Sequence, residues 1–198
     1  MKPDILTALK NATAPLHRRL EGNLNLLAPS FSPADYLRLM KAFWGYYRPI
    51  EARISGVSAL HDWLPDIAKR SKLPLLAADL QVLGVDYDAL DKLPICTVLP
   101  SCTDLAAALG CLYVLEGSTL GGQLISRHFK MLLNLNAENG AAFFIGYGEQ
   151  TGAMWQTFRE VLMATTIDTV DEASMIHAAC ETFITLEHWL CSATIHPA

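Results

Sequence analysis

His17 is the residue with the clearest chemical potential, because an acidic side chain follows it by four positions. Glu21 lies one helical turn later, and residues four apart share a helix face. A carboxylate there can accept the N–H of one imidazole nitrogen, directly or through water, and leave the other nitrogen free for a metal. The alternative is an ordinary His–Glu pair on a solvated helix surface.

Three glycines in one apolar segment form a second unusual feature. The stretch LEGSTLGGQLISRHF, residues 115–129, has helical apolar spacing yet contains Gly117, Gly121 and Gly122. Each glycine inside a helix costs about 1 kcal/mol relative to alanine. Two interpretations stay open: close packing of two helices, or bare backbone that faces a flat ligand.

The segments that position these residues are predicted to be helical almost throughout. Ser32 and Pro33 are typical of a helix start. Thr103 or Asp104 begins the segment that carries the glycines, which we expect to run to about residue 133. Gly84 is predicted to end a short helix that begins near residue 73. Thr-Val-Asp-Glu at 169–172 reads as a capping box for the last helix.

No stretch alternates in the way a strand does, so we predict an all-α single domain over residues 1–198 with seven or eight helices. The chain is 52% hydrophobic and 18% charged, enough apolar material for a sizeable core and an apolar pocket. A net charge of −5 argues against nucleic-acid binding. Without a run of 18 apolar residues or a signal-peptide core, we expect no membrane span and a cytoplasmic location.

The cysteines indicate neither a zinc site nor a disulfide framework. There are five of them, an odd number, and no two form a C-x-x-C pair. We expect reduced thiols that mostly act as small apolar side chains.

Taken together, the His-x-x-x-Glu near the start and the central Tyr-x-x-x-Gly-x-x-x-Gly-Gly-Gln resemble haem oxygenases. More narrowly, YVLEGSTLGGQ is similar to bacterial members with Glu-Gly-Ser, such as those associated with bacterial phytochromes or with iron acquisition. Three further segments extend the resemblance over nearly the whole chain: ATAPLHRRLE, WQTFREVL and ETFITLEHWL.

The resemblance implies a multi-helix fold with haem between the first helix and a kinked distal helix. It makes His17 the axial ligand of the haem iron, oriented by Glu21. It places Gly117 and Gly121 over the haem as catalytic positions, with Gly122 beside them. Haem would be both substrate and cofactor, cleaved with dioxygen to biliverdin, carbon monoxide and ferrous iron.

The same resemblance implies partners for haem and its products. Electrons would come from a separate ferredoxin, flavodoxin or reductase, because the chain has no nucleotide-binding glycine fingerprint. A bacterial phytochrome is a candidate acceptor of biliverdin. The basic residues Arg127, His128 and Lys130 form either a solvated helix face or a docking patch for an acidic donor.

Three residues resemble haem propionate contacts of the family. Lys10 lies two helical turns before His17, and Tyr113 lies one turn before Gly117. Arg159 could bind a carboxylate through two parallel hydrogen bonds. The alternatives are a solvated lysine, a packed tyrosine and a surface arginine.

Ser118 departs from the best-known family pattern. Many haem oxygenases carry an aspartate directly after the first glycine, where it anchors a water network. Glu116 is one residue away and is expected to point elsewhere on the helix. We therefore list Ser118 among the catalytic positions and expect hydroxyls, including that of Thr119, and backbone carbonyls to hold the water.

Other functions are compatible with part of this pattern. A haem carrier or sensor that does not degrade haem would use the same histidine and glycines. A thiaminase-like or di-iron carboxylate enzyme shares the helical architecture, but the di-iron case needs paired Glu-x-x-His motifs. Glu187 and His188 are adjacent instead, and His61-Asp62 lacks the other residues of a metal-dependent phosphohydrolase.

Overall fold

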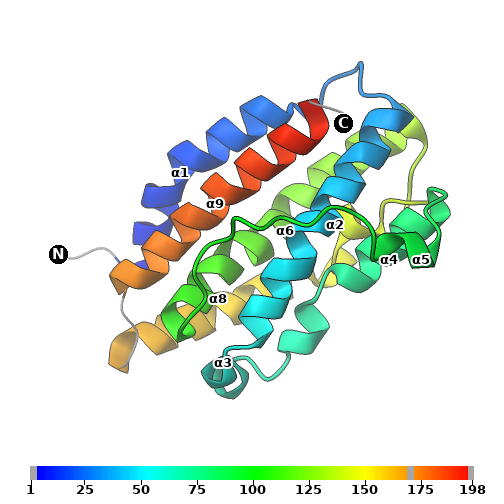
Figure 1. Ribbon diagram of the computed structural model, residues 1–198. Helices are drawn as coiled ribbons and strands as arrows, with labels where there is room; N and C mark the ends of the chain where they lie inside the picture. Colours follow the sequence, from blue (N-terminus) through cyan, green and yellow to red (C-terminus); the bar gives the residue numbers. More distant parts are fainter. Residues whose placement is uncertain (1–3, 169–171, 196–198) are drawn as a thin grey trace.

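The computed structural model describes residues 4–168 and 172–195, and every regular element within them is a helix (Figure 1). The predicted all-α fold is therefore confirmed. In chain order the elements are α1 (Ile5–Leu24), α2 (Pro33–Ser55), α3 (Ser58–Trp63), η1 (Ile67–Arg70), α4 (Leu73–Val82), α5 (Tyr87–Leu90), α6 (Leu105–Leu133), α7 (Ala142–Ile145), η2 (Gly148–Gln150), α8 (Thr151–Asp168) and α9 (Glu172–Ile195). The α-helices exceed the predicted seven or eight because α5 and α7, of four residues each, are too short to give a periodic pattern.

The helix ends follow the local signals in the sequence. Ser32 and Asp35 form a capping box at the start of α2. Asp104 caps α6 by accepting the N–H of Ala107 at 2.9 Å. Gly84 follows α4 with φ +89°, a conformation that favours glycine. The capping box predicted at 169–172 lies largely outside the described residues.

The first and last helices pack side by side and run in the same direction. Cys180 of α9 lies beside Ala12 of α1, with a sulfur-to-carbonyl distance of 3.9 Å. Seven residues further along α9, Glu187 accepts a 2.7 Å hydrogen bond from Arg19. Since the contacts advance together along both helices, α1 and α9 are parallel, as Figure 1 shows.

The long helix α6 packs on α9 in the same direction. A Cβ at Gly110 would lie 2.2 Å from the carbonyl oxygen of Met175, so only glycine permits this close approach. The next residue of α6, Cys111, lies near Thr182 of α9, and Figure 1 shows both helices running in the same direction. By length and composition α6 could cross a membrane, but 67% of its apolar window is buried inside the protein. That burial is typical of the central helix of a bundle. Both α1 and α6 pack against α9.

Asp79 links α4 to α7 and provides a pH-dependent term in stability. It is buried, and its carboxylate accepts the N–H groups of Ala142 at 2.9 Å and Phe143 at 2.8 Å. Burial raises its pKa from 3.8 to about 6. The folded protein binds the Asp79 proton more tightly than the unfolded chain does, so protonation of Asp79 stabilises the fold. This stabilisation is full below the ordinary pKa of 3.8 and is lost as the pH rises through about 6.

We therefore predict that Asp79→Asn changes the pH dependence of the free energy of unfolding. The variant should lose less stability than the native protein between about pH 4 and 7, because the neutral amide does not titrate. Urea unfolding of both proteins across this range measures the difference. Parallel curves would show that the Asp79 carboxyl does not titrate with a raised pKa.

Candidate active site

His17 presents its ring to solvent on α1. Its side chain is 53% exposed, and its ring meets the ring of Phe183 on α9 edge-on at 5.6 Å. Nδ1 lies 3.6 Å from Oε2 of Glu21, so this carboxylate is positioned to orient the imidazole. Among residues 4–168 and 172–195 no partner contacts Nε2, which leaves that nitrogen available to an incoming metal.

The three glycines of α6 have different surroundings. A Cβ at Gly122 would lie 2.4 Å from the carbonyl oxygen of Phe144, so this glycine lets α6 pack against α7. The predicted contact of Gly122 with haem stays a prediction from the family resemblance. A Cβ at Gly121 would meet nothing within 4 Å, and one at Gly117 would touch only the Trp155 ring, at 3.7 Å. Close helix packing thus explains Gly122, whereas Gly117 and Gly121 leave open backbone that could face a ligand.

Apolar side chains surround Gly121 without being covered. Leu120 is 44% exposed and Leu124 is 58% exposed on α6, a helix that otherwise supplies much of the core. Leu124 lies seven residues after Gly117 and shares its face. Exposed apolar residues around bare backbone are typical of a surface that an apolar ligand covers.

A contact between α1 and α6 indicates that the His17 surface of α1 and the glycine face of α6 lie at the same level along the bundle. Tyr113 of α6 lies close to Thr13 of α1. His17 and Gly117 each lie four residues further along their helix, a rise of about 6 Å. Figure 1 shows α1, α6 and α9 running in the same direction, so we infer that His17 and Gly117 lie at similar heights.

The three residues predicted to contact the propionates lie at different positions along the bundle relative to His17. Lys10 is exposed on α1 and lies about 10 Å along the helix from His17, on the same face. Tyr113 packs its ring against Trp155 at 5.7 Å, and burial raises its pKa. The charge of Arg159 acts on Asp4, and Asp4 lies about 20 Å along the axis of α1 from His17. All three propionate contacts stay predictions.

Ser118 connects the glycine face to α2. Its hydroxyl donates to the Leu115 carbonyl at 2.8 Å and lies 3.4 Å from the hydroxyl of buried Tyr47. Burial raises the pKa of Tyr47, which keeps its phenol protonated and able to donate to Ser118. Thr119 is buried and donates to the Glu116 carbonyl at 2.6 Å, so it does not face the glycine surface as the sequence suggested.

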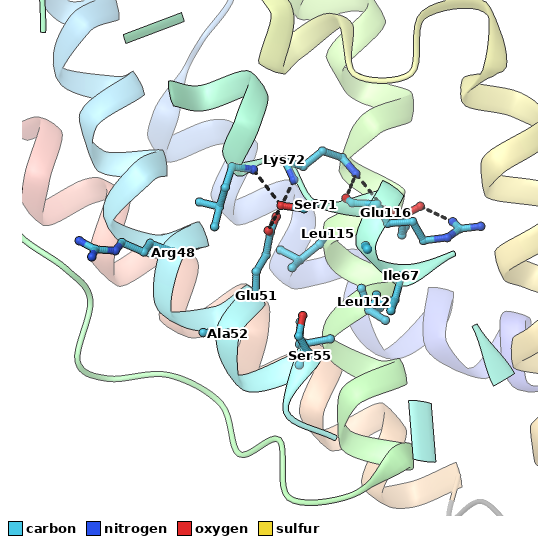
Figure 2. A pocket seen from close by; sticks show the side chains of 14 residues that line it. Arg48, Glu51, Ala52, Ser55, Ile67, Ser71, Lys72, Leu112, Leu115 and Glu116 are labelled. Atoms are coloured by element: carbon cyan, nitrogen blue, oxygen red, sulfur yellow. Dashed lines mark hydrogen bonds and ion pairs between the residues drawn. The ribbon is translucent and has the colours of Figure 1, made fainter. Parts of the chain in front are cut away.

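Glu116 points away from this surface, as expected, into a buried charge cluster behind α6 (Figure 2). Its carboxylate contacts Arg70 Nη1 at 2.6 Å and Lys72 Nζ at 3.0 Å, and it accepts the Tyr147 hydroxyl at 2.7 Å. Burial lowers the pKa of Lys72. The cluster borders a cavity of about 220 Å³ whose wall includes Glu51, and it holds α6 against η1 and η2.

The residues cited for other enzyme classes are not arranged as metal ligands. No group of three or more His, Cys, Asp or Glu that could hold a metal occurs in the described part of the chain. Glu187 binds Arg19 at 2.7 Å and Asn23 at 2.6 Å. His61 Nε2 lies 3.0 Å from the Ser55 carbonyl. These contacts account for both side chains without a metal.

The residues present fit a haem group. A haem site needs a nitrogen ligand for the iron, an apolar surface for the ring and polar groups for the propionates. His17 offers a free Nε2, Gly121 lies in open space between exposed leucines, and Lys10 shares the face of His17. One helix thus supplies the ligand and the other supplies the apolar surface.

Comparison with known proteins identifies the family. The family model described as "Heme oxygenase" matches residues 3–191. This chain belongs to the haem oxygenase family. A curated "Heme oxygenase" of Xanthomonas campestris pv. campestris (strain 8004) is 35% identical over 111 residues, spanning 52% of this chain and 60% of that protein. The match to this curated family member thus covers less than two thirds of its length.

Solved structures agree with the haem oxygenase family assignment at the level of fold. The NO- and CO-bound haem oxygenase of Neisseria meningitidis superposes with a TM-score of 0.83 at 22% identity, covering 100% of this chain and 95% of that one. The haem oxygenase of Leptospira interrogans gives 0.75 at 16% identity, with 96% and 100% coverage. Haem oxygenase 2 of Chlamydomonas reinhardtii, solved without haem, gives 0.72 at 17%, with 95% and 96% coverage.

Proposed function

We propose that this chain cleaves haem to biliverdin, carbon monoxide and ferrous iron, using dioxygen and electrons from a separate donor. The observation that carries the proposal is the free Nε2 of His17 at the height of the open glycine face of α6. Family membership makes haem degradation the favoured function over a carrier or sensor.

In this proposal His17 and Lys10 hold haem from the α1 side. His17 would hold the iron through Nε2, and Glu21 would fix the imidazole ring through Nδ1. Bound haem supplies both the iron that activates dioxygen and the ring that is cleaved. Gly117 and Gly121 leave room for haem and dioxygen, and Leu120 and Leu124 would exclude water from the bound group.

Ser118 and Tyr47 are proposed to handle protons on the α6 side. Ser118 donates to the Leu115 carbonyl, so its oxygen can accept from Tyr47 or from a water molecule. The two hydroxyls can then hold a water molecule at the glycine face, because Ser118 Oγ can accept hydrogen bonds from both Tyr47 and that water. This pair takes the place of the aspartate that many family members carry after the first glycine.

Lys10 and Tyr113 are proposed to set the in-plane orientation of haem. Each charge-assisted contact with a propionate stabilises one orientation by about 1.5–3 kcal/mol. We predict that Lys10→Ala or Tyr113→Phe changes the ratio of biliverdin isomers more than it changes haem affinity. Arg159→Ala should change the ratio less. Chromatography of the extracted products measures the isomer ratio. Native ratios in both Lys10→Ala and Tyr113→Phe would refute the proposal that these residues orient haem.

The partners follow from the same chemistry. A ferredoxin, flavodoxin or reductase is proposed as the electron donor, and the exposed basic residues Arg127 and Lys130 offer it a docking surface. A bacterial phytochrome is the proposed acceptor of biliverdin, and the cytoplasm is the proposed location.

The function is tested by adding ferric haem to the purified protein with a ferredoxin, its reductase and NADPH in air. The expected result is loss of the haem spectrum, appearance of biliverdin and release of carbon monoxide. Catalase in the assay excludes ring damage by free peroxide. Haem that binds but stays intact through reduction and oxygenation would identify a carrier or sensor instead.

A further inference from the structure

Two cysteines at the start of α6 lie close enough to react with each other. Cys102 precedes the helix cap and Cys111 lies in the second turn of α6, and their sulfur atoms are 3.2 Å apart. Both are free thiols in this structure. A disulfide has a sulfur separation of about 2.05 Å, so a shift of about 1 Å would join them.

We infer that Cys102 and Cys111 form a redox-active dithiol that a peroxide converts to a disulfide. The sequence alone predicted reduced thiols that mostly act as small apolar side chains, because no two cysteines form a C-x-x-C pair. The pair arises only because the segment before α6 folds back along the second helical turn.

The two thiols have unequal surroundings, which gives them different roles. Cys111 is fully buried and lies against Thr182 of α9. Cys102 is half-buried and borders a surface pocket of about 450 Å³ that Arg53 also lines. The hydrogen bond with Cys111 and the positive charge of Arg53 lower the pKa of Cys102. Cys102 is therefore the attacking thiolate, and Cys111 resolves the intermediate.

The reaction balances with hydrogen peroxide as the oxidant. The Cys102 sulfur attacks one peroxide oxygen, so an S–O bond forms, the O–O bond breaks and hydroxide leaves. The Cys111 sulfur then attacks Cys102, forming the S–S bond as the S–O bond breaks and its thiol proton leaves with the oxygen as water. Two thiols lose two electrons, and one peroxide becomes two waters.

The bond would attach the segment before α6 to the helix that carries the glycine face. Arg53 already holds this segment through the carbonyl groups of Leu99 at 3.4 Å and Pro100 at 3.3 Å. The disulfide would add a covalent tie at Cys102. Oxidised protein should therefore resist proteolysis between residues 99 and 104 more than reduced protein does.

The test treats the haem-free full-length protein with one equivalent of hydrogen peroxide and then blocks the remaining thiols with an alkylating reagent. The expected result is loss of two of the five thiols, a mass decrease of two hydrogens, and one cross-linked peptide pair joining Cys102 to Cys111. Dithiothreitol should restore both thiols.

Matched variants separate this pair from general thiol oxidation. Cys102→Ser should abolish the cross-link, whereas Cys180→Ser, at another half-buried cysteine, should leave it unchanged. Cys111→Ser should trap Cys102 as a sulfenic acid that dimedone labels. If Cys111→Ser does not fold, circular dichroism will reveal it and Cys102→Ser decides the question. Unchanged thiol loss in Cys102→Ser, or oxidation of native protein without the cross-link, would overturn the inference.

Discussion

Gly121→Ala is expected to make the protein more stable and a much poorer catalyst. A Cβ at this position meets nothing within 4 Å, so the native packing accepts the methyl group. Alanine should then raise the free energy of unfolding by up to about 1 kcal/mol, because it is the better helix former. The same methyl group would occupy space that haem and dioxygen need, so biliverdin formation should fall about 100-fold as the substrate is displaced.

Two other glycines provide controls for this result. Gly22→Ala also places a methyl group in open space, but about 140° around α1 from His17, so it should alter stability without altering turnover. Gly122→Ala should destabilise the fold, since its Cβ would meet the Phe144 carbonyl at 2.4 Å. Thermal melts of the three variants measure stability, and single-turnover spectra measure biliverdin formation. Native turnover in Gly121→Ala would show that haem does not lie against this glycine.

Glu116→Gln is expected to cause a large loss of stability. Glu116 is 1% exposed and is the shared partner of Arg70 and Lys72, both also buried. Removing one member of a buried ion pair leaves an uncompensated charge and costs about 3–5 kcal/mol. The loss should be smaller at high pH, because burial lowers the pKa of Lys72 and the unpaired amine can release its proton.

An exposed ion pair supplies the control. Arg48 and Asp91 are 2.8 Å apart, but their side chains are 40% and 75% exposed. Asp91→Asn should therefore change the free energy of unfolding by less than about 1 kcal/mol. Urea unfolding of both variants at two pH values makes the comparison. Equal effects of the two substitutions would show that the Glu116 cluster does not stabilise the fold.

The sequence predicted the features that depend on local chemistry. Ser32 and Asp104 begin helices where their capping side chains indicated, and Gly84 follows α4 in a left-handed conformation. The His17–Glu21 spacing likewise puts Nδ1 beside the carboxylate, because residues four apart share a helix face.

Features that depend on distant contacts could not be predicted. Gly121 and Gly122 are adjacent and look alike in sequence, yet only the position of α7 determines which one is covered. Arg70 and Lys72 reach Glu116 from 46 and 44 residues away. Tyr47 approaches Ser118 across 71 residues. No helical period encodes such pairs, since tertiary packing brings them together.

The ligand assignment itself is tested most directly by the absorption spectrum of the ferric haem complex of His17→Ala. His61→Ala, whose ring bonds to the Ser55 carbonyl on the surface, is the matched control. We predict that His17→Ala shifts the Soret band and loses biliverdin formation, that added imidazole restores the native spectrum, and that His61→Ala changes neither. A native Soret band and full turnover in His17→Ala would show that another residue binds the iron, and would contradict the site proposed between α1 and α6.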